Sequence, residues 1–204
     1  MKILFFDTET TGFPSNWPIE SQPNIVQLAG MYKDQDVREE FDYLFKSLKP
    51  IPKQTSDIHW ITDDMVADRP LLYKDKFIVD FMRMMKSADI IVGHNVEYDF
   101  KMIFIEIERT IWDAKNDEVI PEKMKKFNEF KMECVNKSIC TMKASIDLCK
   151  LPGRYGQHKW PKLQELHKHL YWEEFDSAHN ALNDIMATER CFNTLVEKQI
   201  IKLQ

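Results

Sequence analysis

A fully apolar segment near the start of the chain limits the fold more than any other feature of the sequence. Residues Lys2–Phe6 contain four consecutive apolar side chains. This pattern is typical of a strand in the middle of a sheet that is covered on both faces. Asp7 and Glu9 follow at once, in the sequence Asp-Thr-Glu-Thr-Thr-Gly. The fold must therefore surround this strand and place two carboxylates at its end.

Strand and helix patterns alternate along the rest of the chain. Asn24–Tyr32 and Val37–Phe45 are strands joined by a short polar stretch, which predicts an antiparallel hairpin. Asp89–Val92 and Ser138–Met142 complete five strands. Helices are expected at Ser56–Trp60, Thr62–Ala67, Lys76–Ser87, Val96–Ile111, from about 143 to Lys150, Pro161–Tyr171 and about 178–198. This order predicts a three-layer α/β fold with a central mixed five-stranded sheet flanked by helices.

Length and composition are those of one globular domain. The chain has 204 residues, of which 44% are hydrophobic and 30% are charged, enough for a single core over residues 1–204. Residues 112–137 are charged and weakly periodic, and we interpret them as an insertion with some helix over Glu122–Phe130. No apolar stretch approaches the roughly 20 residues of a membrane span. No signal peptide is recognised, so we expect a cytoplasmic protein without a membrane partner.

The four cysteines do not form the closely spaced pair that is typical of zinc or redox motifs. Three of them lie in apolar or helical contexts, where a reduced and buried thiol is the ordinary interpretation. A structural zinc ion held by Cys134, Cys140, Cys149 and His158 is the much less favoured alternative on their spacing.

Positive charge is concentrated in one part of an acidic chain. The whole sequence has a net charge of −5, whereas residues 121–170 hold eleven lysine or arginine residues and five acidic residues, a net charge of +6. Two interpretations are about equally favoured. This part of the chain either forms an ordinary solvated surface or presents a local phosphate-binding face, to which binding would depend on salt.

Acidic residues and one histidine occur in three separate patches. Asp7 and Glu9 are two positions apart in an extended segment, so both point to one side at the carboxyl end of their strand, where α/β sheets usually bind ligands. Asp184 is the one acid on a ridge of small and apolar residues in the last helix, and such a carboxylate seldom lacks a partner. His179 precedes it by five positions, and Asp99 lies in the first turns of the helix that follows the strand at 89–92. Each patch alone favours a structural role, but together they indicate a catalytic site.

The three patches resemble the motifs of the DnaQ-like (DEDDh) 3′–5′ exonucleases of the RNase H-like superfamily. The first motif is Asp-Thr-Glu-Thr-Thr-Gly at 7–12, and the second is Gly-His-Asn-x-x-x-Asp-Phe at 93–100. The third is Ala-His-Asn-Ala-x-x-Asp at 178–184. Their order and spacing agree over essentially the whole chain. Residues 58–66 look like a secondary signature of the family, with Trp60 where glycine is more common.

The resemblance implies an RNase H-like fold and hydrolysis that depends on two Mg²⁺ or Mn²⁺ ions. Their ligands would be the four motif carboxylates: Asp7, Glu9, Asp99 and Asp184. His179 would be the general base, and a histidine at this position distinguishes the DEDDh branch. Physical chemistry agrees, because four carboxylates would repel an anionic phosphodiester unless cations lay between them. The terminal nucleotide would be lined by residues in or beside the first two motifs: Thr8, Thr10, Thr11, Phe13, His94 and Asn95.

The favoured function is a free-standing 3′–5′ exonuclease that releases nucleoside monophosphates from single-stranded or frayed 3′ ends of nucleic acid. The motifs do not decide between DNA and RNA, and DNA is somewhat favoured. The last helix is expected to end near Lys198, which leaves too little chain for the polymerase-binding tail of proofreading subunits. The oligomeric state stays open. The alternative, a catalytically silent nucleic-acid-binding module of a larger complex, is disfavoured because all five motif residues are intact.

Overall fold

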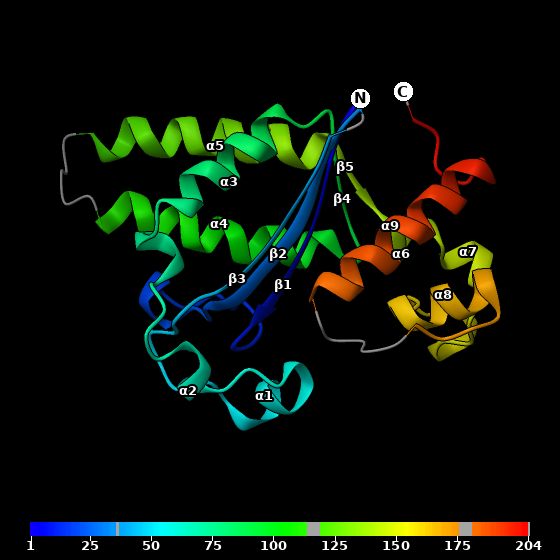
Figure 1. Cartoon of the computed structure of the whole chain (residues 1–204), viewed down its shortest axis with the longest axis horizontal. Helices are drawn as coiled ribbons and strands as arrows, with labels where there is room; N and C mark the ends of the chain where they lie inside the picture. The colour runs from blue at the N-terminus through cyan, green and yellow to red at the C-terminus, as the bar shows by residue number, and fades with distance from the viewer. Residues whose placement is uncertain (36, 114–118, 176–180, 204) are drawn as a thin grey trace.

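The computed structural model describes residues 1–35, 37–113, 119–175 and 181–203. A five-stranded sheet in the order β3-β2-β1-β4-β5 lies between two layers of helices (Figure 1). The central strand β1 (Lys2–Thr10) pairs antiparallel with β2 (Ile25–Asp34) and parallel with β4 (Ile90–Gly93). The edge strands are β3 (Val37–Leu44) and β5 (Ser138–Cys140). The predicted three-layer fold with a mixed sheet is confirmed.

Alternate side chains of β1 pack into two separate hydrophobic cores. Leu4 and Phe6 face the layer that contains α3 (Phe77–Ser87), α4 (Val96–Asp113) and α5 (Ile120–Asn136). Phe5 faces the opposite layer, which contains α8 (Leu163–Tyr171) and α9 (Ala181–Glu197). Burial of each of these side chains contributes about 2–3 kcal/mol. The apolar run at the start of the chain is thus covered on both faces, as its sequence predicts.

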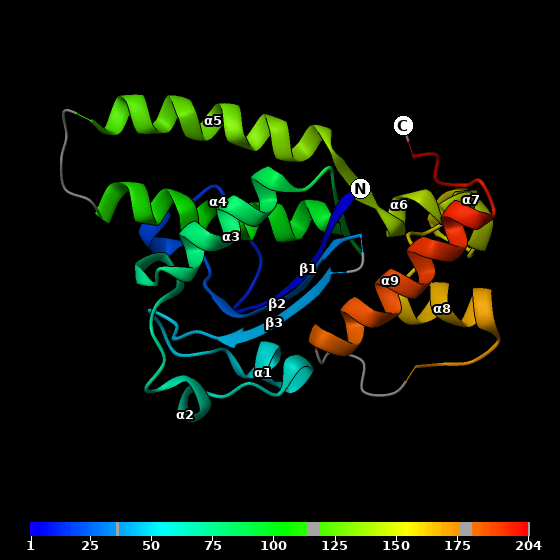
Figure 2. The same ribbon diagram turned by 45° about the horizontal axis from the view of Figure 1, so that its top comes forward.

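Two short helices lie beyond the carboxyl end of β1. These are α1 (Lys53–His59) and α2 (Asp63–Val66), which follow β3 in the chain (Figures 1 and 2). Ile51 before α1, Ile61 between the two helices and Val66 of α2 form a small third core with Val26 of β2. The first described turn of α9 reaches the same end of the sheet. The carboxyl end of β1 is therefore surrounded by elements from distant parts of the sequence.

Helix α5 is longer than the sequence indicates. It covers 17 residues rather than the nine predicted within the charged stretch. Ile120, Phe127 and Cys134 are buried at intervals of seven residues, and this stripe packs toward α3 and α4. The many lysines and glutamates between these positions conceal the stripe in the sequence. The interpretation of residues 112–137 as an insertion stays a prediction.

The region after β5 also differs from the prediction. A single helix to Lys150 is wrong, because the chain forms α6 (Thr141–Ala144) and α7 (Ile146–Cys149) with a break at Ser145. The Ser145 hydroxyl bonds back to the carbonyl oxygen of Thr141, an interaction that competes with a continuous helix. Helix α8 begins at Leu163 rather than at Pro161, because the Glu165 carboxylate accepts the backbone N–H of Lys162 and caps the helix there.

The last helix ends at Glu197, one residue before the predicted end. The beginning of the predicted helix, together with His179, falls within residues 176–180, outside the described residues. None of the described helices is long and apolar enough to cross a membrane.

Candidate active site

Three carboxylates converge at the carboxyl end of β1. Asp7 and Glu9 follow the buried Phe5 by two and four positions, so they point to the same face of the sheet as Phe5, the face that packs against α9. Asp184 lies in the first described turn of α9. One carboxylate oxygen from each of these three residues lies within 4.8 Å of the other two. The first and third sequence motifs therefore meet in space.

Asp99 approaches the same place from the other face of the sheet. It lies in the first turn of α4 and is buried, with 3% of its surface exposed. Its carboxylate accepts hydrogen bonds from the Thr8 hydroxyl at 2.7 Å and from the Thr8 backbone N–H at 3.2 Å. Thr8 lies between the two strand carboxylates and so points toward α4. A hollow of about 350 Å³ is lined by all four acids.

Four carboxylates line the hollow, and no lysine or arginine is among the described residues that line it. Burial raises the pKa of Asp7 well above its usual value, and the charges of Asp99, Glu9 and Asp184 raise it further. Burial and repulsion by Asp184 and Asp99 raise the pKa of Glu9 to about 8. Burial raises the pKa of Asp99 to about 7, although the bonds from Thr8 oppose the shift.

The donor set fits a divalent metal ion. Carboxylate oxygens are the ligands that Mg²⁺ and Mn²⁺ prefer. Here they are close together and partly or wholly buried, and no lysine or arginine is among the described lining residues. Such a cluster gains stability when a cation replaces its protons. The site is therefore a possible acidic metal centre. Asp99 lies outside the group of oxygens within 4.8 Å, because Thr8 holds it.

Tyr98 fastens the loop after β1 to α4. Its hydroxyl donates to the carbonyl oxygen of Gly12 at 2.9 Å and also contacts the hydroxyl of Thr10. Burial raises the pKa of Tyr98 to about 12, so this hydroxyl keeps its proton. Phe13 packs edge-on against the ring, with 5.6 Å between centroids, yet is 84% exposed. Thr10 and Phe13, both expected near the terminal nucleotide, thus line the hollow.

His94 and Asn95 line the hollow as well. The Nε2 atom of His94 donates to the carbonyl oxygen of Pro161 at 3.0 Å, and Nδ1 accepts from the Thr141 hydroxyl at 3.0 Å. Burial lowers the pKa of His94 to about 4, so the ring is neutral. His94 therefore ties β4 to α6 and to the segment before α8, and neither ring nitrogen is left for the substrate. Asn95 has φ 75°, a left-handed conformation that asparagine tolerates well.

Two of the predicted site residues are not placed in this hollow. Thr11 points elsewhere, since its hydroxyl accepts the backbone N–H of Asn24 at 2.9 Å and it lines a separate, smaller hollow. His179 lies outside the described residues. Its role as a general base stays a prediction from the sequence motif.

Four further side chains line the hollow without having been assigned to the site from the sequence: Thr55, Ile58, His59 and Tyr98. The first three lie on α1, and the signature at residues 58–66 could have indicated His59. His59 is 5% exposed, and its Nδ1 accepts the backbone N–H of Ile61 at 3.1 Å. No sequence signal indicated Tyr98, because its partners Gly12 and Thr10 are 86 and 88 positions away in the chain.

The positively charged segment 121–170 stays apart from the acidic hollow. None of its lysines or arginines is among the described lining residues. Five of its lysines form ion pairs with nearby carboxylates: Lys126, Lys137, Lys143, Lys159 and Lys168. Phosphate binding by this segment stays a prediction. The alternative zinc site is not formed, because in the described part of the chain Asp7, Glu9 and Asp184 are the one group placed to share a metal ion.

Comparisons with known proteins agree with this geometry. A family model described as exonuclease (RNase_T) matches residues 4–192. The uncharacterized exonuclease CP81 of Escherichia phage 186 is 29% identical over 185 residues, which cover 91% of this chain and 83% of that protein. DNA polymerase III subunit epsilon of Buchnera aphidicola subsp. Schizaphis graminum is 30% identical over 120 residues, which cover 56% of this chain. This match spans 50% of the length of that subunit.

Solved structures share the fold. Exonuclease X in complex with 5′ overhanging duplex DNA superposes with a TM-score of 0.57 at 21% identity, over 98% of this chain and 94% of that one. E. coli Exonuclease I in complex with a dT13 oligonucleotide gives a TM-score of 0.71 at 17% identity, over 97% of this chain and 41% of that one. With the family match across most of its length, the chain belongs to the DnaQ-like exonucleases of the RNase H-like superfamily.

Proposed function

We propose that this exonuclease works in the 3′–5′ direction and releases nucleoside monophosphates from single-stranded or frayed 3′ ends, using two Mg²⁺ or Mn²⁺ ions. The observation that carries the proposal is the meeting of Asp7, Glu9 and Asp184 within 4.8 Å, with the buried Asp99 in the same hollow. Such a cluster suits cations that in turn neutralise a phosphodiester. No lysine or arginine is among the described residues that line the hollow.

The four carboxylates would hold the ions: Asp7, Glu9, Asp99 and Asp184. When bound, such ions polarise the phosphate and lower the pKa of a bound water. His179, in the segment before α9, would accept the proton of the attacking water on its imidazole ring. Thr8 keeps the Asp99 carboxylate in place through two hydrogen bonds. Thr8 thus acts as a positioning residue for one of the proposed ligands.

The terminal nucleotide would occupy the hollow beside these acids. Tyr98 holds the loop at residues 10–12, and the exposed ring of Phe13 offers an apolar face to the terminal base. We favour DNA as the substrate. Support comes from relatives whose names or complexes involve DNA, namely DNA polymerase III subunit epsilon, Exonuclease X and Exonuclease I. No described residue of the hollow identifies contacts to a 2′-hydroxyl.

One assay tests direction, metal dependence and substrate together. Single strands of DNA and RNA with the same sequence are labelled at the 5′ end or at the 3′ end and incubated with Mg²⁺, Mn²⁺ or EDTA. We expect a ladder of shortening products from the 5′-labelled strand and immediate release of a labelled mononucleotide from the 3′-labelled strand, both abolished by EDTA. Release of a 5′-labelled mononucleotide as the first product, or digestion in EDTA, would contradict the proposal. Binding without cleavage would support the silent module instead.

A further inference from the structure

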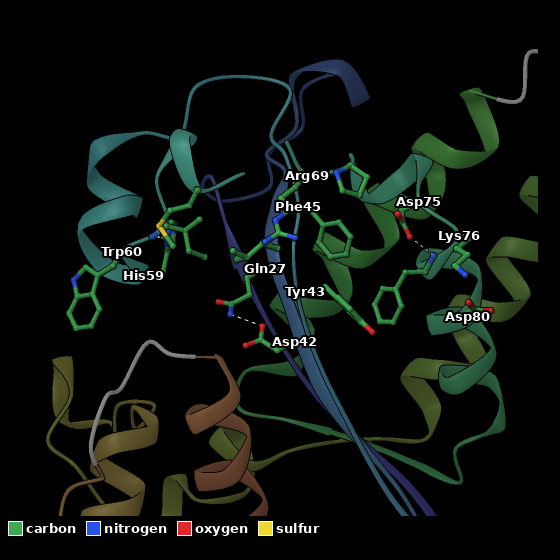
Figure 3. A pocket seen from close by; sticks show the side chains of 15 residues that line it. Gln27, Asp42, Tyr43, Phe45, His59, Trp60, Arg69, Asp75, Lys76 and Asp80 are labelled. Atoms are coloured by element: carbon green, nitrogen blue, oxygen red, sulfur yellow. Dashed lines mark hydrogen bonds between the residues drawn. The ribbon is translucent and has the colours of Figure 1, made fainter. Parts of the chain in front are cut away.

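A second and larger hollow adjoins the active-site hollow. It measures about 850 Å³ and lies between the end of β3, the connection from α1 to α2, and the start of α3 (Figure 3). His59 lines both hollows and so forms part of the wall between them. Gln27 lines the larger hollow and lies opposite Glu9 in the pairing of β1 with β2. The two hollows are therefore neighbours beside His59, and the larger one continues around the β3 edge of the sheet to α3.

Trp60 stands at the end of this hollow beside His59 (Figure 3). It terminates α1 in a left-handed conformation, with φ 59°, and 66% of its surface is exposed. This conformation is unfavourable for a bulky side chain and is readily adopted by glycine. Glycine would therefore fit the backbone conformation at this position with less strain than tryptophan. The indole is mostly exposed, so it contributes little to the core. The indole is free to contact a ligand.

Two cations that line the hollow are free to bind an anion. Arg69 and Lys76 are exposed, and their side chains form no hydrogen bond or ion pair with another residue that the structure describes. Of the three acids that line the hollow, only Asp80 pairs with a cation, whereas Asp42 and Asp75 accept hydrogen bonds from neutral groups and keep their negative charge. Asp42 accepts from Gln27 at 2.7 Å, Asp75 accepts the backbone N–H of Phe77 at 2.8 Å, and Asp80 pairs with Arg83 at 2.6 Å.

These groups are arranged along the hollow. Trp60 lies at one end, the Arg69 side chain extends into the middle above Gln27, and Lys76 lies at the far end (Figure 3). Tyr43, which is 49% exposed, lines the hollow between them. An exposed aromatic ring followed by unpaired cations is the combination that binds single-stranded nucleic acid, where bases stack and phosphates pair with charge.

We propose that this hollow binds the part of a single-stranded substrate that lies upstream of its 3′ end. Trp60 stacks on a base, and Arg69 binds a phosphate. The proposal rests on the proposed function, because the active-site hollow must hold the 3′ end for the strand to continue past His59. It predicts that the enzyme prefers strands long enough to reach Trp60.

The test compares a twelve-nucleotide strand with a dinucleotide as substrates for the native protein and for Trp60→Gly. Glycine suits the left-handed conformation, so the variant is expected to fold. We expect the ratio of kcat/KM for the long strand to kcat/KM for the dinucleotide to fall roughly tenfold in Trp60→Gly, mainly through KM, since a stacked base contributes on this scale. Arg69→Gln should lower the same ratio and weaken the dependence of KM on salt.

Trp172→Gly is the matched control. Trp172 also terminates a helix in the left-handed conformation, with φ 63°, and is 92% exposed, but it lines neither hollow. Its substitution should leave the ratio at the native value. On a long strand with abasic positions upstream of its 3′ end, the native protein and Trp60→Gly should have the same kcat/KM, because no base is present for Trp60 to stack on.

Two failures are distinguishable. If the native protein cleaves both substrates and Trp60→Gly keeps the native ratio, or Trp172→Gly lowers the ratio as much, the upstream site is wrong and the proposed function stands. If the native protein cleaves neither substrate in Mg²⁺ or Mn²⁺, the proposed function is wrong and the upstream site falls with it.

Discussion

At the scale of single residues, Asp7 shows how function opposes stability. Its pKa is raised by burial and by three neighbouring acids, so its charge is unfavourable in the metal-free protein. We predict that Asp7→Asn lowers exonuclease activity by orders of magnitude, because a proposed metal ligand is lost. The melting temperature in EDTA should stay equal or rise, because a buried repulsion is removed. Substantial residual cleavage by a well-folded variant would show that Asp7 is not a ligand.

His179 carries the other residue-scale prediction. His179→Ala should still bind Mn²⁺, because the four carboxylates remain, but should lose roughly two to four orders of magnitude in kcat. The activity of the native enzyme should rise with pH through the titration of the imidazole and then flatten, provided that chemistry limits the rate. Calorimetry and a pH–rate profile measure the two parts. Near-native turnover of the variant would mean that another group accepts the proton.

At the scale of elements, helix α4 holds the connection between β1 and β2 through a buried ion pair. Glu106 accepts from Arg109 at 2.7 Å and from Asn24, and Arg109 donates to the carbonyl oxygens of Ile19, Gln22 and Pro23. We predict that Arg109→Ala lowers the free energy of unfolding by about 3–5 kcal/mol, because it leaves a buried carboxylate unpaired. Urea unfolding measures this loss.

The exposed pair between Arg83 and Asp80 is the control for that measurement. Both side chains are substantially exposed, at 74% and 44%. Arg83→Ala should therefore change the free energy of unfolding by about 0.5 kcal/mol or less. Equal losses in the two variants would contradict the anchoring role of Arg109.

Strands and helices could be predicted from the sequence where a single hydrophobic pattern was clear. The apolar run of β1 and the alternation of Asp7 and Glu9 suffice to place both carboxylates on one face of the sheet. The stripe of α5 was hidden, because only three buried residues at intervals of seven occur among many charged ones. The break at Ser145 depends on a local side-chain bond that competes with the helix, and periodicity does not reveal such a bond.

At the scale of the whole molecule, the acidic site should govern how stability depends on pH. The pKa of Glu9 is raised to about 8 and that of Asp99 to about 7, so the folded protein binds more protons than the unfolded chain between about pH 4 and pH 8. Stability of the metal-free protein should therefore fall as the pH rises through this range. His94 has the opposite effect on stability. Its pKa is lowered from 6.5 to about 4 in the folded protein, so its contribution to the free energy of unfolding is lost as the pH falls below 6.5.

Melting temperatures in EDTA between pH 5 and pH 8 test this expectation. The metal-free protein should be most stable at mildly acidic pH, and Mg²⁺ should restore stability at pH 8. Asp7→Asn should flatten the decline toward pH 8, because it removes one source of repulsion. A melting temperature that rises steadily to pH 8 in EDTA would contradict the raised pKa values.

The site as a whole could be predicted only in part. Sequence motifs identified the four acids that the structure gathers in one hollow, because their order matched a known family. The hydrogen bonds of Tyr98 and the engagement of both nitrogens of His94 depend on residues far apart in the chain. The same holds for the larger hollow beside Trp60, which forms between β3, α1 and α3. Such contacts arise from packing, and no single segment encodes them.

The proposed function requires that the carboxylates of the hollow hold the divalent metal on which cleavage depends. Calorimetric titration of the native protein with Mn²⁺ at pH 7, in buffers of different ionisation enthalpy, tests it most directly. We expect binding of two ions per chain with release of protons, because acids with pKa values of about 7 and 8 must lose their protons to coordinate metal. Absence of binding, or an unchanged isotherm and proton release in Asp7→Asn, would contradict it.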